Sequence, residues 1–156
     1  MVGPTKKGKG TKIMLATDGC GVPLTGILSS ASTSEYNLIF PTLDTLSVEV
    51  RPTHPRKKFD KLIADRGYDA KWVRDELRRR GTTAYIPKRR KRGEVEGPTY
   101  NQRIKPYYQT RWIVERTFAW FNNFRRLVTR WEKYVSTYQG FFHLACIMIC
   151  LGKVLK

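Results

Sequence analysis

Acidic residues are scarce in this sequence. The chain has 13 Asp and Glu residues against 30 Lys and Arg residues, which leaves a formal net charge of +17. Such an excess of one sign repels itself in the compact state and favours a polyanionic partner. Nucleic acid is the first candidate, with an anionic membrane surface or simple solubility as the alternatives. Because 40% of the residues are hydrophobic and 12% are aromatic, a disordered basic tail is excluded, and 156 residues suit one folded domain.

Cysteine and histidine are also few. The three cysteines cannot all pair, show no C-x2-C spacing, and give no convincing zinc site with the two histidines. Cys146 and Cys150 lie four residues apart in an apolar run and are expected to be small buried hydrophobes. That run, His143–Leu151, is too short to span a bilayer, and the basic N-terminus does not resemble a secretory signal. A reducing cytoplasm, with no membrane association, is the expected location.

Hydrophobic periodicity and turn residues predict an α/β fold. Residues 1–10 form a basic lead-in that is expected to be flexible, and residues 11–156 form the folded domain. The expected elements are a hairpin of strands 11–17 and 22–28 with Asp18 in its turn, a helix after the capping box Ser32–Glu35, a strand 61–64, a helix capped by Asp69 and stopped by Gly81, a strand 82–86, and a final helix 137–154 packed under the sheet. The order strand, helix, strand between residues 61 and 86 predicts parallel pairing.

Four polar side chains lie at regular spacing near the middle of the chain. Tyr108, Arg111, Glu115 and Asn122 are separated from the first by three, seven and fourteen residues. On one helix starting near Tyr107 they would fall within a stripe about 60° wide. The opposite side of that helix would be apolar, with Ile113, Val114, Phe118, Phe121 and Phe124. A break of the helix is expected near Asn123.

The stripe contains a carboxylate, and a second acid is placed where α/β sheets often present chemistry. Asp65 follows the apolar strand Leu62–Ala64. Two carboxylates on a cationic surface suit Mg²⁺ (or Mn²⁺), which prefers oxygen ligands and supports phosphoryl transfer on an anionic substrate. Arg111 could orient Glu115 or hold a phosphate oxygen, and an ordinary helix ion pair is the alternative.

Clustered cations predict contacts with DNA phosphates. Five of them are consecutive, Lys88, Arg89, Arg90, Lys91 and Arg92, and Arg125 and Arg126 follow the polar stripe. A charge run of this kind can also be a solvated loop, but in a chain of this net charge phosphate contact is favoured.

These residues together resemble a known family. The pattern Tyr108-x2-Arg111-x3-Glu115-x6-Asn122 resembles the Y-x2-R-x3-E-x6-K signature of bacterial insertion-sequence transposases of the DDE type, in the branch grouped as insertion-sequence family five. The text around the glutamate (residues 111–120), the segment Ile63–Asp69 around Asp65, the hairpin from Gly10 to Leu24 and the ending Phe142–Ala145 are similar as well, so nearly the whole chain is covered.

The resemblance implies a ribonuclease H-like mixed sheet flanked by helices. It also implies two aspartates and a glutamate that bind Mg²⁺ or Mn²⁺, hydrolysis of DNA at the element ends, and attack of the freed 3′-hydroxyl on target DNA. Asp65 matches the second acid and Glu115 the third, both as metal ligands, while Tyr108 and Arg111 match supporting positions. Asn122 stands where the signature commonly has Lys. Transposases of this type generally act as multimers on paired DNA ends.

The sequence departs from the family at its front. The family's first catalytic aspartate lies on a strand before the segment Gly8–Lys12, where this sequence has none, and Asp18 matches a hairpin turn rather than that strand. The chain is therefore expected to be a C-terminal portion lacking the first strand, either a remnant or a downstream reading frame with an upstream-frame product as partner. Alone it is expected to be marginally folded and weakly active or inactive.

Two other functions remain open at this stage. One is a basic nucleic-acid-binding module without catalysis, for which the net charge and the run 88–92 suffice. The other is a related nuclease that hydrolyses DNA without strand transfer. Replacement of Asp65 or Glu115 distinguishes catalysis from binding alone, because only an active enzyme would lose metal-dependent cleavage.

Overall fold

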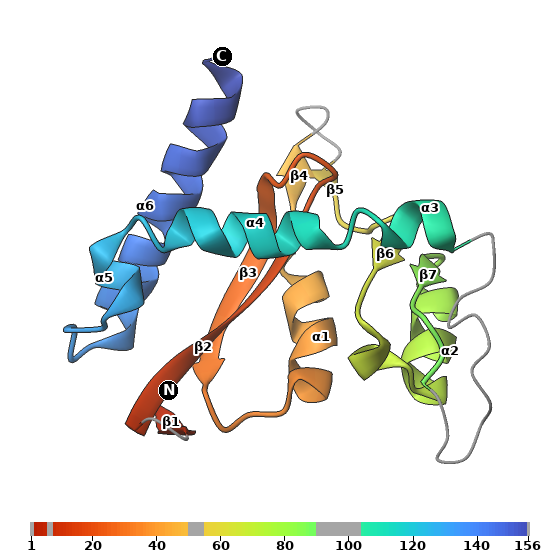
Figure 1. The fold of residues 1–156 in the computed structure, drawn as a ribbon, viewed down its shortest axis with the longest axis horizontal. Coiled ribbons are helices and arrows are strands. Elements are labelled where there is room, and N and C mark those ends of the chain that lie inside the picture. The colour runs from red at the N-terminus through yellow and green to blue at the C-terminus, as the bar shows by residue number, and fades with distance from the viewer. Residues whose placement is uncertain (1, 6–7, 50–54, 90–103, 156) are drawn as a thin grey trace. The chain divides into compact units, whose positions relative to one another are not determined.

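The computed structural model describes residues 2–5, 8–49, 55–89 and 104–155. The chain divides into two units (Figure 1). Unit 1 comprises Met1–Lys57 and Ile113–Lys156, and unit 2 comprises Lys58–Trp112. The boundary between them falls within the region of the predicted polar stripe.

Unit 1 is built on an antiparallel sheet in the order β1-β2-β3. Strand β1 is Gly3–Thr5, β2 is Gly8–Thr17 and β3 is Pro23–Ser30. The predicted hairpin is confirmed, since Ile13 pairs with Leu28 and Thr11 with Ser30. The strands extend further toward the N-terminus than expected: β1 and the first residues of β2 lie within 1–10, the segment expected to be a flexible lead-in.

The hairpin turn is closed by Asp18. Its Oδ1 accepts hydrogen bonds from the N–H groups of Cys20 and Val22, each at 2.8 Å. Gly21 has a φ of 85°, a left-handed conformation that a residue with a side chain adopts only under strain. Asp18 is therefore a turn aspartate, as the sequence indicated.

Helices cover both faces of this sheet. Helix α1 (Glu35–Asp44) lies on the face of Thr25, whose hydroxyl donates to the Thr42 carbonyl at 3.2 Å. Leu28, three residues along the same strand, points to the opposite face, where it packs with α6 (Val135–Val154). The N-cap of α1 is Ser34 without a side-chain cap bond, so the predicted capping box did not form there. A short pair, β4 (Val48–Glu49) and β5 (Pro55–Arg56), follows α1.

The core of unit 1 lies between β2–β3 and the last three helices. These are α4 (Trp112–Phe121), α5 (Arg125–Val128) and α6. The buried residues of this core are Leu28, Phe121, Leu127, Tyr138, Phe142, Ala145 and Ile149. The predicted packing of the final helix on the sheet is thus confirmed. Gly26 makes room for it, because a Cβ at that position would meet the Phe142 ring at 2.7 Å.

Thr117 joins α4 to the hairpin turn. Its side chain is fully buried, and its hydroxyl donates to the Gly21 carbonyl at 2.8 Å. The guanidinium of Arg116 donates to the neighbouring Cys20 carbonyl at 2.9 Å. Two turn carbonyls are therefore satisfied by one helix, which fixes the position of α4 within unit 1.

Unit 2 contains the predicted strand–helix–strand. Strand β6 (Lys61–Ile63) pairs in parallel with β7 (Thr83–Tyr85), and α2 (Lys71–Arg79) connects them after the short 3₁₀ helix η1 (Arg66–Tyr68). Val73 and Leu77, one turn apart on α2, are 0% exposed. Helix α3 (Lys105–Tyr108) ends the unit. The α/β class is confirmed, and the ribonuclease H-like arrangement stays a prediction.

Helix α6 is longer than the apolar run seen in the sequence. Its 20 residues include an 18-residue window of mean hydropathy 1.4, so by length and composition alone it could cross a membrane. The core helix of a soluble protein passes the same test. Since Tyr138, Phe142 and Ala145 pack against the sheet of unit 1, the helix is weak evidence for a membrane.

Thr117 provides a test of how unit 1 is held together. Replacement Thr117→Val keeps the volume but removes the donor to the buried Gly21 carbonyl, so the free energy of unfolding is expected to fall by about 1–3 kcal/mol. Urea denaturation followed by circular dichroism measures the change. Thr137→Val, at an exposed position on α6, is the matched control and should change stability by less than about 0.5 kcal/mol. Equal effects of the two substitutions would contradict this role of Thr117.

Candidate functional site

Asp65 lies at the carboxyl end of a parallel strand pair, as expected. It follows β6 with an extended backbone (φ −67°, ψ 156°) and is exposed. The N–H of Ala64 donates to the Tyr85 carbonyl at 3.4 Å, which continues the pairing with β7 up to the residue before Asp65. In open α/β sheets this edge is where ligands bind.

Helix α3 is held on the same strand pair by Tyr107. The Lys61 ammonium donates to the Tyr107 hydroxyl at 3.2 Å and lies 4.8 Å from the ring centroid. The rings of Tyr85 and Tyr107 have centroids 4.2 Å apart. The hydrogen bond raises the pKa of Lys61 and lowers the pKa of Tyr107 from their ordinary values, and the charge of Lys61 acts on Tyr107 in the same direction. This cluster anchors the helix that contains Tyr108.

Tyr108 and Arg111 are brought together in unit 2. The Arg111 guanidinium carbon lies 5.7 Å from the centroid of the Tyr108 ring, within the range of a cation–π contact. Their role as supporting residues in a reaction stays a prediction.

The single long helix that the spacing predicted is wrong. Helix α3 ends at Tyr108 and α4 begins at Trp112, so Tyr108 and Glu115 lie on different helices. The N–H groups of Thr110 and Arg111 bond three residues back, to Tyr107 and Tyr108. The Thr110 hydroxyl also donates to the Tyr107 carbonyl at 2.6 Å. This local bond competes with the helical pattern, which explains the interruption.

Glu115 and Asn122 belong to unit 1. Glu115 is exposed in the first turn of α4, where a carboxylate is favoured by the helix dipole. Asn122 is exposed in the turn after α4, and its N–H donates to the Phe118 carbonyl at 3.2 Å. The helix therefore ends at Phe121, close to the predicted break. The convergence of Glu115 with Asp65 stays a prediction.

The structure describes part of the predicted basic surface. Lys88 and Arg89 are exposed beyond β7, while Arg90, Lys91 and Arg92 lie outside the described residues. Arg125 and Arg126 begin α5 and are exposed. Arg126 also pairs with Glu132, with an N–O distance of 3.1 Å, so part of its charge is balanced within unit 1.

Asp69 has a different role from the one expected. The N-cap of α2 is Ala70, and Asp69 binds Arg74 instead, with distances of 2.8 Å to Nε and 2.6 Å to Nη2. Its second oxygen accepts the N–H of Arg89 at 2.5 Å, and Arg74 Nη2 also donates to the Ile86 carbonyl at 2.7 Å. Asp69 thus joins the start of α2 to the segment after β7. The only sequence signal for this contact was an acid, Asp69, at the expected start of a helix that has Arg74 five residues later.

The acids of the described residues do not form a complete metal site by themselves. No group of three or more His, Cys, Asp or Glu side chains suited to a metal ion occurs within residues 2–5, 8–49, 55–89 and 104–155. The three cysteines are free, and burial is the main cause that raises the pKa of Cys146, to about 12. That thiol is therefore unsuited to bind a metal as a thiolate.

Comparison with known proteins identifies the class that this fold and these acids define. The family described as "Transposase DDE domain" matches residues 3–151. The chain therefore belongs to this family of DDE transposase domains, as the resemblance in the sequence indicated.

Two relatives are transposases of insertion sequences. One is named as a transposase for insertion sequence element IS402 of Burkholderia cepacia, and is 34% identical over 149 residues, or 94% of this chain. The other is named as a transposase for insertion sequence element IS6501 of Brucella ovis, and is 36% identical over 91 residues, or 58% of this chain. Each match spans 66% of the relative's length. No solved structure matches the chain.

The Lys61–Tyr107 contact provides a test of how α3 is anchored. Replacement Lys61→Met removes the donor and the positive charge, so the pKa of Tyr107 is expected to rise toward its ordinary value of 10.0. Titration of tyrosine ring carbons by NMR measures this pKa. Lys105→Met removes an exposed lysine from α3 itself and should leave the pKa of Tyr107 unchanged. An unchanged Tyr107 pKa in Lys61→Met would refute the contact.

Asp69 provides a second test, which concerns the stability of unit 2. Burial acts to raise the pKa of Asp69, but the Arg89 N–H and the Arg74 guanidinium outweigh burial and hold it below the ordinary value of 3.8. Asp69→Asn is expected to lower the free energy of unfolding by about 1.5–3 kcal/mol at neutral pH. Because the folded-state pKa is depressed, this stabilisation is present above the unfolded pKa and lost as the pH falls through the folded pKa.

The same experiment therefore has a pH signature. Denaturation of wild type and Asp69→Asn at neutral pH and in acid should give a difference that shrinks below about pH 4. Asp44→Asn, an exposed acid of α1, is the control and should have a small effect at every pH. A difference that does not depend on pH would mean that the carboxylate charge is not what stabilises the unit.

Proposed function

We propose that this chain acts in DNA transposition as part of the catalytic domain of an insertion-sequence transposase. It would take part in metal-dependent cleavage of DNA at the element ends and in transfer of the 3′ end to target DNA. The observation that supports this most directly is the match to the DDE transposase domain over residues 3–151. The exposed carboxylates of Asp65 and Glu115, at a strand end and in the first turn of a helix, agree with it.

Asp65 and Glu115 are the proposed metal ligands. Their carboxylate oxygens fit Mg²⁺ or Mn²⁺, which take hard oxygen donors, and both residues are exposed to solvent. When bound, such an ion stabilises the negative charge that develops on the reacting phosphate. Two acids are an incomplete set, so further ligands would come from water, from DNA, or from a polypeptide segment such as an upstream-frame product.

Other residues of the chain would position the DNA. Tyr108 and Arg111, which lie in cation–π contact, are proposed to orient the acids or a phosphate oxygen. A guanidinium is suited to this because its parallel N–H donors match two phosphate oxygens. Exposed Lys88, Arg89 and Arg125 are proposed to contact the phosphate backbone, together with Arg126 and the run Arg90–Arg92. Asn122 would contribute a neutral contact where the family signature has a cation.

The proposed partners and location follow from this role. DNA is the proposed substrate, both as element ends and as target, and the chain would act as a homo-oligomer on paired ends. The proposed location is the bacterial cytoplasm, in association with the nucleoid. The net charge of +17 supports attraction to a polyanion in all of these settings.

Replacement of the two acids tests the catalytic part of the proposal. Asp65→Asn and Glu115→Gln are each expected to weaken Mn²⁺ binding by at least about tenfold and to abolish any nicking of supercoiled plasmid in Mg²⁺ or Mn²⁺. Both should spare or strengthen DNA binding without metal, because each removes a negative charge. Calorimetric titration of Mn²⁺, gel analysis of the plasmid and fluorescence anisotropy measure the three properties. Asp44→Asn removes one exposed acid elsewhere and should behave as wild type.

The outcomes separate the competing functions. Normal Mn²⁺ binding in both variants would refute the proposed ligands. DNA binding with no metal dependence of any kind would favour the basic binding module. Cleavage without joining of a labelled 3′ end to a second DNA would favour a nuclease that lacks strand transfer.

A further inference from the structure

Helix α2 has three sides that differ in chemistry. At about 100° per residue, Val73 and Leu77 fall on one side, and both are fully buried. The remaining polar residues divide between the other two sides. Lys71, Arg74 and Arg78 share one stripe about 60° wide, and Glu76, Arg79 and Arg80 lie within about 100° of one another on the other side. Asp75 falls between the two.

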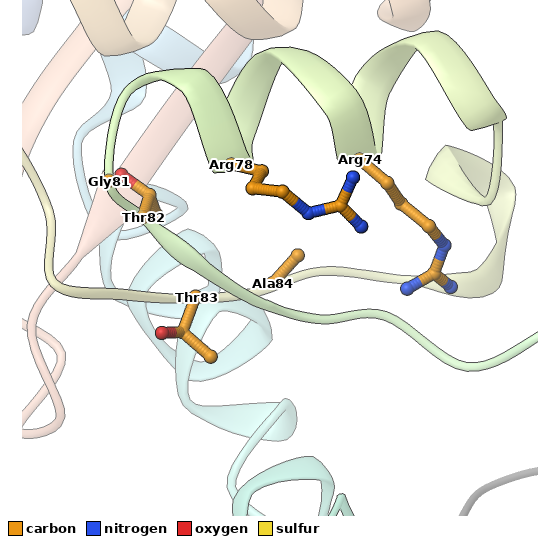
Figure 2. Close-up of a pocket in the computed structure, with 6 residues that line it drawn as sticks. All are labelled: Arg74, Arg78, Gly81, Thr82, Thr83 and Ala84. Atoms are coloured by element: carbon orange, nitrogen blue, oxygen red, sulfur yellow. The ribbon is translucent and has the colours of Figure 1, made fainter.

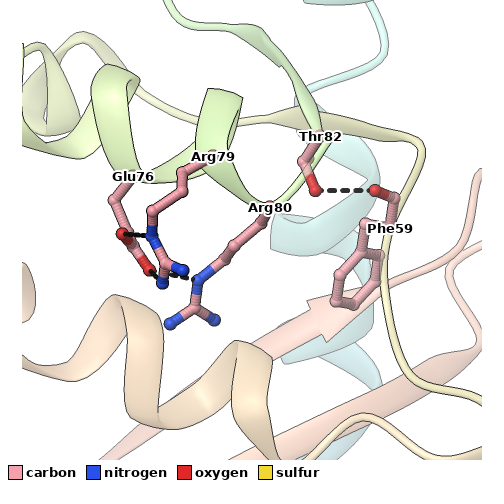
Figure 3. Close-up of polar contacts among 5 residues, drawn as sticks. All are labelled: Phe59, Glu76, Arg79, Arg80 and Thr82. Atoms are coloured by element: carbon pink, nitrogen blue, oxygen red, sulfur yellow. Dashed lines mark hydrogen bonds and ion pairs between the residues drawn. The ribbon is translucent and has the colours of Figure 1, made fainter.

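On the stripe of Glu76, both arginines are bound to one carboxylate. Glu76 accepts hydrogen bonds from Arg79 at 2.6 and 2.7 Å and from Arg80 at 2.7 Å (Figure 3). The hydrogen bonds to Arg79 and then to Arg80 lower the pKa of Glu76 to about 2, so the carboxylate is charged at neutral pH. Two cations therefore share one carboxylate on this side.

The stripe of Arg74 and Arg78 borders two hollows in the surface of unit 2. One hollow, of about 420 Å³, is lined by Arg74, Arg78 and residues 81–84, and Figure 2 shows both guanidinium groups on the side of α2 that faces Thr83 and Ala84. The other, of about 730 Å³, is lined by the same two arginines with Lys71, Lys88 and Arg89. Asp69 and Asp75 complete its lining. The two arginines are common to both hollows.

The charge of the larger hollow is positive even when its acids are counted. It is lined by five cations and two carboxylates, and one of these, Asp69, is already engaged by Arg74 and the Arg89 N–H. That bond holds Arg74 in place with its side chain 28% exposed. The hollow therefore presents a fixed guanidinium together with other cations to solvent.

Arg78 is the cation of the stripe that can most readily change partners. It pairs with Asp75 at an N–O distance of 3.0 Å, and the two side chains are 78% and 49% exposed. An exposed pair of this kind contributes little to stability, so a phosphate can replace the carboxylate at little cost. A guanidinium binds a phosphate through two parallel hydrogen bonds, which favours the exchange.

We propose that this α2 face, formed by Lys71, Arg74, Arg78, Lys88 and Arg89, binds the phosphodiester backbone of DNA. Arg78 makes the exchangeable contact, and Arg74 is the fixed positive group beside it. The inference rests on the proposed action on DNA and extends it to a helix that neither the polar stripe nor the run 88–92 had indicated. The adjoining hollows are open and lined by charged groups, which suits a backbone that passes along the surface.

A pair of adjacent arginines tests the proposal in the whole chain. Arg78→Gln and Arg79→Gln remove the same charge from neighbouring positions of α2, and the two side chains are similarly exposed, at 78% and 73%. Binding of a labelled DNA duplex is measured by fluorescence anisotropy between about 50 and 200 mM salt. Loss of one phosphate contact lowers the slope of log K against log salt by about 0.9 and the affinity by roughly eightfold near 0.1 M salt.

We expect Arg78→Gln to show this loss of salt slope and affinity and Arg79→Gln to show little change. The two variants should have equal melting temperatures. Arg78→Lys keeps the charge and should retain the wild-type salt slope. Equal slopes for Arg78→Gln and Arg79→Gln would overturn the proposal. That result would leave the proposed function standing as long as the wild type binds DNA and the acid substitutions behave as expected. Conversely, failure of the acid substitutions would leave the Arg78 result intact.

Inorganic phosphate distinguishes a DNA backbone from a free anion. Added at matched ionic strength, it should leave the difference between Arg78→Gln and Arg79→Gln unchanged, because one free phosphate competes weakly with a backbone held at several contacts. If inorganic phosphate abolishes the difference, the hollow is a site for the free anion, and the assignment to DNA is wrong.

Discussion

Asp69 is the residue on which the arrangement of unit 2 depends most. One oxygen binds the Arg74 guanidinium and the other binds the Arg89 N–H, so a single carboxylate joins the start of α2 to the chain beyond β7. Arg74 continues the connection to the Ile86 carbonyl. Without a negative charge at this point, Arg74 would lose its partner while facing other cations. The βαβ unit and the basic surface are therefore held by the same contact.

Because acidic residues are scarce in this chain, each of them has a large effect on the local charge balance. Asp18 closes the hairpin turn, Glu76 holds two arginines, and Glu132, only 5% exposed, pairs with Arg126. These acids balance charge within their own unit. Asp65 and Glu115 are placed differently, since both are exposed and stand at the end of a strand and the start of a helix. Both are proposed metal ligands, and neither belongs to the buried core.

Sequence patterns predicted the elements that depend on local contacts and on pairing between neighbouring elements. The alternation in residues 11–17, with turn residues after it, predicted the hairpin, and the βαβ order predicted the parallel pairing of residues 61–63 with 83–85. The pattern at Tyr108, Arg111 and Glu115 predicted one helix, and this was wrong. A single hydroxyl, that of Thr110, bonds the Tyr107 carbonyl and favours a turn there.

Sequence patterns could not predict the contacts between distant segments. Periodicity did not single out Thr117, which is fully buried and whose hydroxyl donates to the Gly21 carbonyl, 96 residues away in the chain. Asp69 had the position of a helix cap, yet the N–H that it binds belongs to Arg89, which is 20 residues distant. Periodicity reports only which side of an element is apolar, so it cannot identify partners of this kind. The same limit applies to Asp65 and Glu115, whose predicted convergence rests on family resemblance.

Helix α2 shows how a short helix can fold and also present charge. Val73 and Leu77 are buried on one side, and apart from Trp72 the other residues of the helix are charged. The acids differ in exposure: Glu76, which binds both Arg79 and Arg80, is 25% exposed, whereas Asp75, the partner of Arg78, is 49% exposed. Attraction between exposed charges is weak in water, and a phosphate backbone offers many charges in a row. Arg78, whose carboxylate partner is the most exposed of those on α2, is thus the arginine that a DNA phosphate can most readily engage.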